Sequence, residues 1–64
     1  MQEGIVKFFD TEKGFGFIKP TNYNEDVFVH LSGLIHEIMR HDKVSFQITE
    51  GKKGLQAINV ERID

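Results

Sequence analysis

The chain contains no cysteine, no tryptophan and a single proline among its 64 residues. Without cysteine it forms no disulfide and offers no thiolate to a metal, which excludes disulfide-rich scaffolds and cysteine-based zinc modules. It also lacks an apolar run long enough to cross a membrane, and residues 1–4 lack the basic start and apolar stretch of a signal peptide. These absences predict a cytoplasmic protein that does not associate with a membrane.

A surplus of positive charge, which would indicate a nucleic-acid binder, is missing as well. Eight Lys and Arg stand against ten Asp and Glu, so the formal net charge is −2. The acidic excess is concentrated in residues 21–42, where Arg40 is the single Lys or Arg against four acidic residues, so the two flanks are free to present basic faces. The length predicts one small domain, residues 1–64, with no room for a second.

Five short runs rich in β-branched and aromatic residues, each bounded by turn residues, are typical of strands. We expect these strands at residues 4–10, 15–19, 26–31, 43–50 and 55–63. In residues 32–42 the apolar side chains recur at helical spacing, which predicts a short helical turn with Ser32 as its cap. Five strands and one irregular crossing favour an all-β fold, a small closed or nearly closed barrel, because closure removes exposed strand edges.

The second and third expected strands carry apolar residues on both faces. With period-two alternation, Phe15, Phe17 and Lys19 share one face, and the opposite face carries Gly14, Gly16 and Ile18. In the next strand Asp26, Phe28 and His30 share one face, and the opposite face carries Val27, Val29 and Leu31. Burying an unpaired Lys or Asp is costly, so the two faces with the aromatic rings are predicted to point outward.

An outward cluster of phenylalanine and histidine marks a binding surface. Unpaired bases offer flat faces to such rings, and each base–aromatic stack is worth about 1–3 kcal/mol. Lysines at positions 7, 13, 19, 52 and 53 are available to meet the phosphates beside those stacks. The pattern therefore indicates binding to single strands rather than duplexes, whose base faces are hidden.

Four motifs in order along the chain carry a resemblance to a known family. They are 4–10 (GIVKFFD), 13–18 (KGFGFI), 27–30 (VFVH) and 53–57 (KGLQA). Over essentially its whole length the sequence resembles the bacterial cold-shock proteins. The resemblance implies a five-stranded antiparallel OB-type barrel that binds single-stranded RNA and DNA and acts as an RNA chaperone or a regulator of transcription and translation.

The resemblance also implies which side chains bind nucleic acid. The family's binding positions fall on Lys7, Phe8, Lys13, Phe15, Phe17, Asp26, Phe28, His30 and Lys53. Most members carry Trp where this chain has Phe8, and an aromatic residue is common where it has Leu31, so fewer stacking contacts are expected. Lys7 and Phe8 are neighbours, and both reach one surface only if the first strand is bulged or strongly coiled. Phe9 matches an aromatic that is at least partly packed in the fold.

Other classes of function fit the sequence less well. His30, His36 and His41 lack zinc-ligand spacing, and no cysteine joins them, so no metal and no cofactor are expected. A shallow open sheet builds no oxyanion hole and excludes no water, so the protein is not expected to be an enzyme.

The alternative function is an SH3-like barrel that binds a Pro-rich peptide in its aromatic groove, although such grooves usually pair aromatic rings with acidic loops. A monomer is the simplest expectation, and Tyr23 is either a further stacking residue or part of a loop.

Overall fold

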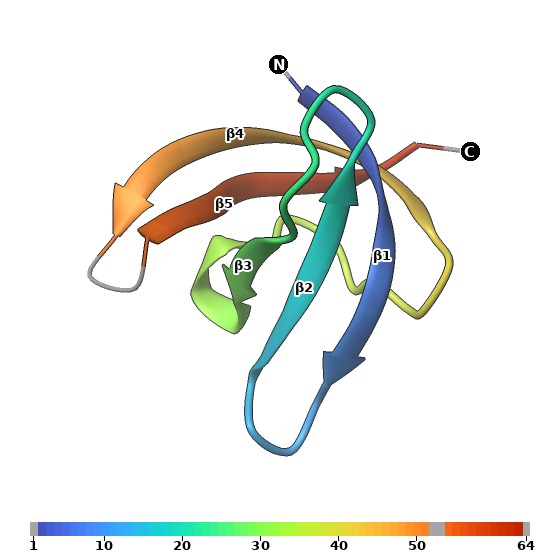
Figure 1. Ribbon diagram of the computed structural model, residues 1–64. Helices are drawn as coiled ribbons and strands as arrows, with labels where there is room; N and C mark the ends of the chain where they lie inside the picture. The colour runs from blue at the N-terminus through green and yellow to red at the C-terminus, as the bar shows by residue number, and fades with distance from the viewer. Residues whose placement is uncertain (1, 52–53, 64) are drawn as a thin grey trace.

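The computed structural model describes residues 2–51 and 54–63. Its five strands are β1 (Gln2–Asp10), β2 (Phe15–Pro20), β3 (Val27–His30), β4 (Lys43–Gly51) and β5 (Gly54–Arg62). They form a closed barrel in the order β1-β2-β3-β5-β4, with the β1–β2 and β4–β5 hairpins as its two longest parts (Figure 1). The expected all-β, five-stranded barrel is confirmed. Adjacent strands pair antiparallel except β3 and β5, which pair in parallel over two residue pairs.

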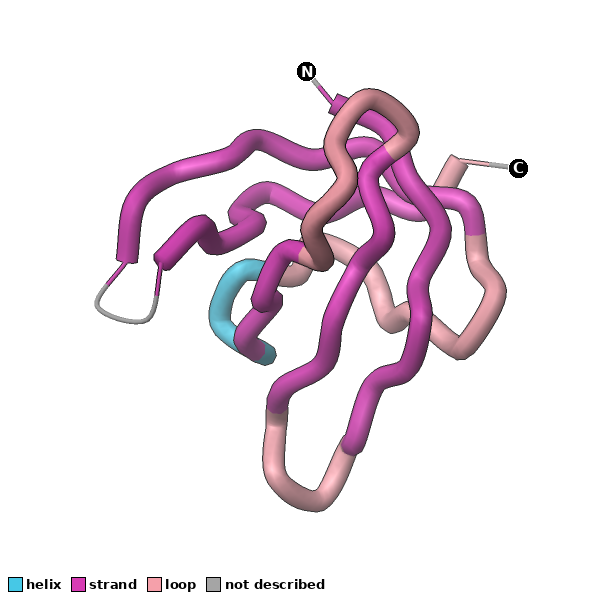
Figure 2. The backbone as a smooth tube through the Cα atoms, in the orientation of Figure 1, coloured by secondary structure: helices cyan, strands magenta, loops and turns pink. Residues whose placement is uncertain are grey.

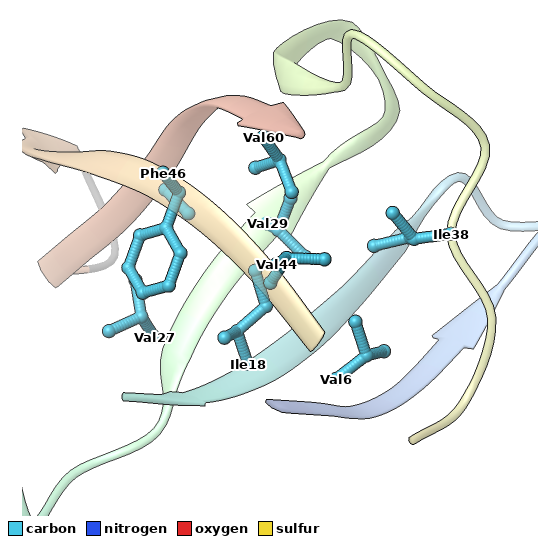
Figure 3. Packing of buried hydrophobic residues seen from close by; sticks show 9 residues of the cluster. Val6, Ile18, Val27, Val29, Ile38, Val44, Phe46 and Val60 are labelled. Atoms are coloured by element: carbon cyan, nitrogen blue, oxygen red, sulfur yellow. The ribbon is translucent and has the colours of Figure 1, made fainter. Parts of the chain in front are cut away.

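The interior is filled mainly by β-branched side chains, as period-two alternation predicts. Val6, Ile18, Val27, Val29, Val44, Phe46, Ala57 and Val60 are fully buried. Figure 3 shows these side chains converging from different strands, with the ring of Phe46 as the largest. Leu31, however, is 55% exposed. The expectation that it faces the core is wrong, because β3 ends at His30 and the chain then turns into the 3-10 helix η1 (Leu31–Gly33).

The predicted helical turn in residues 32–42 is also wrong in extent and in its cap. The only helix within the described residues is η1 (Figure 2). His30 caps it, because its side chain accepts a hydrogen bond from the Ser32 backbone N–H. Beyond it the chain runs as a loop, which is attached to the barrel by backbone hydrogen bonds such as the one from the Ile35 N–H to the Val60 carbonyl. Ile38 is 5% exposed and belongs to the core cluster. Position 38 is apolar because its side chain is buried in the core, and not because it belongs to the apolar face of a helix.

A bulge in β1 arranges the outer face of the β1–β2 hairpin. Val6 pairs with Ile18 and Phe8 pairs with Phe17, so Lys7 is the extra residue between two regular pairs. Lys7 and Phe8 are consequently both exposed, which meets the condition deduced from the sequence.

The close approach of β1 and β2 requires a glycine opposite Phe9. Gly16 is buried and pairs with Phe9. A Cβ at this position would lie against the Phe8 carbonyl oxygen and 2.8 Å from the Phe9 Cα. Any larger residue at position 16 would therefore push β1 away from β2, together with the Phe8 side chain that β1 carries.

Candidate nucleic-acid interface

Four phenylalanine rings from three neighbouring strands meet on the outer face of the barrel, and we call them the aromatic cluster: Phe8, Phe15, Phe17 and Phe28. Phe15 and Phe28 are stacked with ring centroids 5.9 Å apart and planes at 24°. Phe17 packs edge-on against Phe28 at 5.9 Å, and Phe8 lies 5.5 Å from Phe17. Strand pairing produces this arrangement, since Phe17 is directly opposite Phe8 on one side and Phe28 on the other.

The rings of the aromatic cluster keep part of their surface open to solvent. Phe8 is 38% exposed, and the other three rings are half-buried. By contrast Gly16, Ile18, Val27 and Val29, which alternate with them along β2 and β3, are buried. The predicted orientation of the two strands is therefore confirmed: the aromatic side chains point outward and the aliphatic ones inward.

One ion pair connects the bulge of β1 to the loop before β3. The Lys7 ammonium lies 2.8 Å from a carboxylate oxygen of Asp26, and both side chains are accessible to solvent. Exposed pairs of this kind add at most about 1 kcal/mol to stability, so the ammonium can exchange its carboxylate partner for a phosphate at little cost. The second Asp26 oxygen has no partner among the described residues and is available to accept a hydrogen bond.

The orientation of the His30 ring is fixed by the turn that follows it. The Ser32 backbone N–H donates to His30 Nδ1 at 3.1 Å, and the Ser32 hydroxyl lies 2.9 Å from the same nitrogen. A nitrogen that accepts a backbone N–H carries a lone pair, so the neutral ring holds its hydrogen on Nε2. His30 is exposed and pairs with Phe15 across β2 and β3, so it presents an N–H donor beside the aromatic cluster.

The remaining predicted site residues are less closely grouped. Lys13 is exposed in the β1–β2 turn, whose backbone is held by the Asp10 carboxylate through the N–H groups of Glu12 and Lys13. Lys53 lies outside the described residues. Phe9 is half-buried and packs against the core, in line with the packing role that the resemblance implies.

Sequence reasoning missed two groups of residues near this face. Gln56 pairs with Phe28 across the parallel contact between β3 and β5, and no local signal predicts that register. Arg40 and His41 line a hollow beside Lys7 and Lys19, although more than thirty residues separate Lys7 from Arg40 in the sequence. A contact this distant follows from barrel closure and not from any motif.

The described residues contain no group of three or more His, Cys, Asp or Glu side chains that is positioned to hold a metal ion. No helix within them is long and apolar enough to cross a membrane.

Comparison with solved structures supports the fold. The structure of drosophila Unr CSD456 superposes with a TM-score of 0.82 at 24% sequence identity. The match covers 98% of this chain and 26% of the Unr chain, so this chain spans about a quarter of that structure.

Comparison with protein families identifies the chain. The major cold shock protein of Micrococcus luteus is 45% identical over 67 residues, covering 98% of this chain and all of that protein. Cold shock protein CspC of Bacillus subtilis is 44% identical, covering 97% and 98% of the two chains. The peptide-binding alternative is not favoured by these matches. Residues 2–63 match the family model described as the 'Cold-shock' DNA-binding domain, and the chain belongs to this family of nucleic-acid-binding proteins.

Proposed function

We propose that the protein, a single domain over residues 1–64, binds single-stranded RNA and DNA by stacking unpaired bases on the aromatic cluster. The observation that carries this proposal is the exposure of four phenylalanine rings, in contact with one another, on one outer face of the barrel. The interior of the barrel is already filled by other side chains. Such a patch costs free energy in water unless a ligand covers it. Bases in a duplex do not expose their faces, so the ligand is an unpaired strand.

The polar residues around the aromatic cluster complete the binding surface. Lys7, Lys13 and Lys53 neutralise phosphates, while the His30 Nε2–H donates to an acceptor on a base. Asp26 accepts from a base N–H with its unpaired oxygen. Because the net charge of the chain is −2, long-range attraction to a polyanion is weak and stacking supplies much of the affinity.

This binding mode gives the protein the activity of an RNA chaperone without any catalytic step. A ligand that binds only one of two states shifts the equilibrium toward that state by mass action. Binding to unpaired bases therefore opens RNA hairpins and alters transcription or translation of the bound strands. We infer a non-enzymatic monomer that acts in the cytoplasm, where such strands are found.

Titration with a fluorescently labelled oligothymidine or oligouridine of about seven nucleotides tests the proposal. We expect saturable binding at low salt, with a log–log salt dependence of about −2 to −3 for three or four phosphate contacts at roughly −0.7 each. An unlabelled strand should compete, and a blunt duplex of the same length should not. Absence of saturable binding at 20 mM salt, or equal competition by the duplex, would contradict the proposal.

A further inference from the structure

Beside the aromatic cluster, toward the end of β2 at Pro20, the surface is hollowed across β1. We call this feature the basic hollow, and its lining consists of Ile5, Val6, Lys7, Lys19, Asn24, Asp26, Arg40 and His41. The lining carries three cationic side chains and one carboxylate, in a chain whose overall charge is negative. It contains no Phe or Tyr ring, which distinguishes it from the neighbouring stacking surface.

Most of the positive charge in the basic hollow is uncompensated. Asp26 is paired with Lys7. Lys19 and Arg40 are both exposed, and neither makes a salt bridge within residues 2–51 and 54–63. Two cations without partners that line one hollow repel each other unless an anion lies between them, so the hollow is suited to an anionic ligand.

The loop that carries Arg40 and His41 is fixed to β1 by backbone hydrogen bonds. The His41 N–H donates to the Val6 carbonyl at 2.8 Å, and the Val6 N–H donates to the Asp42 carbonyl at 2.9 Å. β4 pairs with this edge of β1 as far as Ile5, and the two bonds at Val6 extend the pairing by one residue. The backbone next to Arg40 is therefore fixed beside β1 before any ligand arrives, and Arg40 lines the same hollow as Lys7 and Lys19.

The turn itself is closed by its own polar groups. The Asp42 carboxylate accepts from the Met39 N–H at 2.8 Å, and the Asp42 N–H donates to the Met39 carbonyl at 3.0 Å. His41 adopts a φ of 74° between them, in the left-handed region that non-glycine residues seldom occupy. A histidine at this position costs conformational energy that Gly would avoid, and functional sites are where such costs are commonly found.

We propose that the basic hollow binds the sugar-phosphate backbone of a single strand as the strand leaves the aromatic cluster at the Pro20 end of β2. The inference rests on the proposed function and deepens it. Lys19 lies on the same face as Phe17, two residues further along β2, or about 7 Å at the usual rise of a strand. Phosphates that follow the last stacked base thus pass between Lys19 and Arg40, whose guanidinium is shaped to bind a phosphate through two N–H groups.

The hollow lies at one end of the aromatic cluster only, so it gives the complex a direction. A strand extended at one of its ends gains the phosphate contacts of the hollow, and a strand extended at the other end gains no contact with Lys19 or Arg40. Extensions of three abasic nucleotides isolate this effect because they add phosphates without bases. The probes are a thymidine tetranucleotide alone, with the abasic extension at its 5′ end, and with the extension at its 3′ end.

We expect the full-length protein to bind one of the two extended probes at least about fivefold more tightly than the tetranucleotide at 50 mM salt. The salt dependence should steepen by about 0.7 for each added phosphate contact. Arg40→Ala should abolish this gain and leave the affinity for the bare tetranucleotide unchanged. Arg62→Ala is the matched control, since it removes the same charge from an exposed arginine outside the hollow. Thermal melts establish that both variants are folded.

Each outcome separates this inference from the proposed function. Equal gains at both ends, or a gain that survives Arg40→Ala, overturns the basic hollow as a phosphate site while tetranucleotide binding still supports stacking. A further probe carries three thymidine nucleotides in place of the abasic extension. If this probe shows the gain and the abasic one does not, the hollow takes a base, and the inference is also overturned. If neither the tetranucleotide nor a heptanucleotide binds, the proposed function fails and this inference fails with it.

Discussion

The two faces of the sheet formed by β1, β2 and β3 both carry apolar residues, but of different kinds. The inner face presents aliphatic residues such as Val6, Ile18 and Val27, all with no exposed surface. The outer face presents the aromatic cluster, whose rings stay partly open to solvent beside Lys7 and His30. Hydrophobicity alone does not distinguish the inner face from the outer face. The polar residues that share a face with the aromatic rings identify the outer face, because their charges cannot be buried without partners.

Truncation on the inner face should produce the largest effect. Ile18→Ala removes three carbon atoms from the barrel interior, and such changes cost about 2–5 kcal/mol of folding free energy. For a chain of 64 residues this is a large part of the total stability. Urea denaturation followed by circular dichroism measures the loss. If Ile18→Ala were as stable as the parent while Phe17→Ala unfolded, the assignment of the faces would be wrong.

Adding one methyl group between β1 and β2 should affect both faces at once. Gly16→Ala places a Cβ against the Phe8 carbonyl and the Phe9 Cα, and overpacking of this kind costs about 1–3 kcal/mol. Because the strands must separate, Phe8 moves away from Phe17 and oligonucleotide affinity falls along with the melting temperature. Thr11→Ala, in the exposed β1–β2 turn, serves as the control that leaves both properties unchanged.

Truncation on the outer face should reduce binding and spare the fold. Phe17→Ala removes the ring that contacts both Phe8 and Phe28. We expect a loss of about 1–3 kcal/mol in binding, or about 5- to 150-fold in affinity, with little change in the urea midpoint. Ile35→Ala truncates an apolar residue that is 54% exposed outside the aromatic cluster, and it should bind normally. Comparable losses in the two variants would show that stacking does not drive binding.

Enlarging a ring of the outer face should give the smallest change, and in the opposite direction. Phe8→Trp extends the ring area available to a base at a position that is 38% exposed, so we expect affinity to rise by about two- to fivefold. The new indole also supplies a fluorescence signal, which bound bases should quench. An unchanged affinity together with an unquenched indole would mean that position 8 lies outside the contact area.

The architecture was predictable where side chains alternate regularly. The strands and their inner and outer faces follow from local pattern and from the cost of burying charge. The need for a bulge at Lys7 follows from the binding positions that the family resemblance implies for Lys7 and Phe8. The segment after His30 was not predictable in this way. Ile38 is apolar because its side chain fills the core from a loop. The helical spacing of the apolar residues in this segment therefore does not reflect a helix. Likewise, Arg40 reaches Lys7 only through backbone bonds between residues 41–42 and Val6, which depend on closure of the barrel.

The parallel contact between β3 and β5 also bears on how the barrel forms. The β1–β2 and β4–β5 hairpins join residues that are near in sequence, whereas Phe28 and Gln56 are 28 positions apart and belong to a contact of only two residue pairs. Closing a longer loop costs more entropy, so the hairpins should form before this contact and before the β1–β4 contact, which joins residues 38 to 44 positions apart. The seam between β3 and β5, with two residue pairs against four between β1 and β4, is the weaker of these two contacts. The same seam should open first in the native state, and amide hydrogen exchange should be faster at Phe28 and Val29 than at Val6 and Ile18. Because Phe28 belongs to the aromatic cluster, a bound strand would hold the seam closed and slow that exchange.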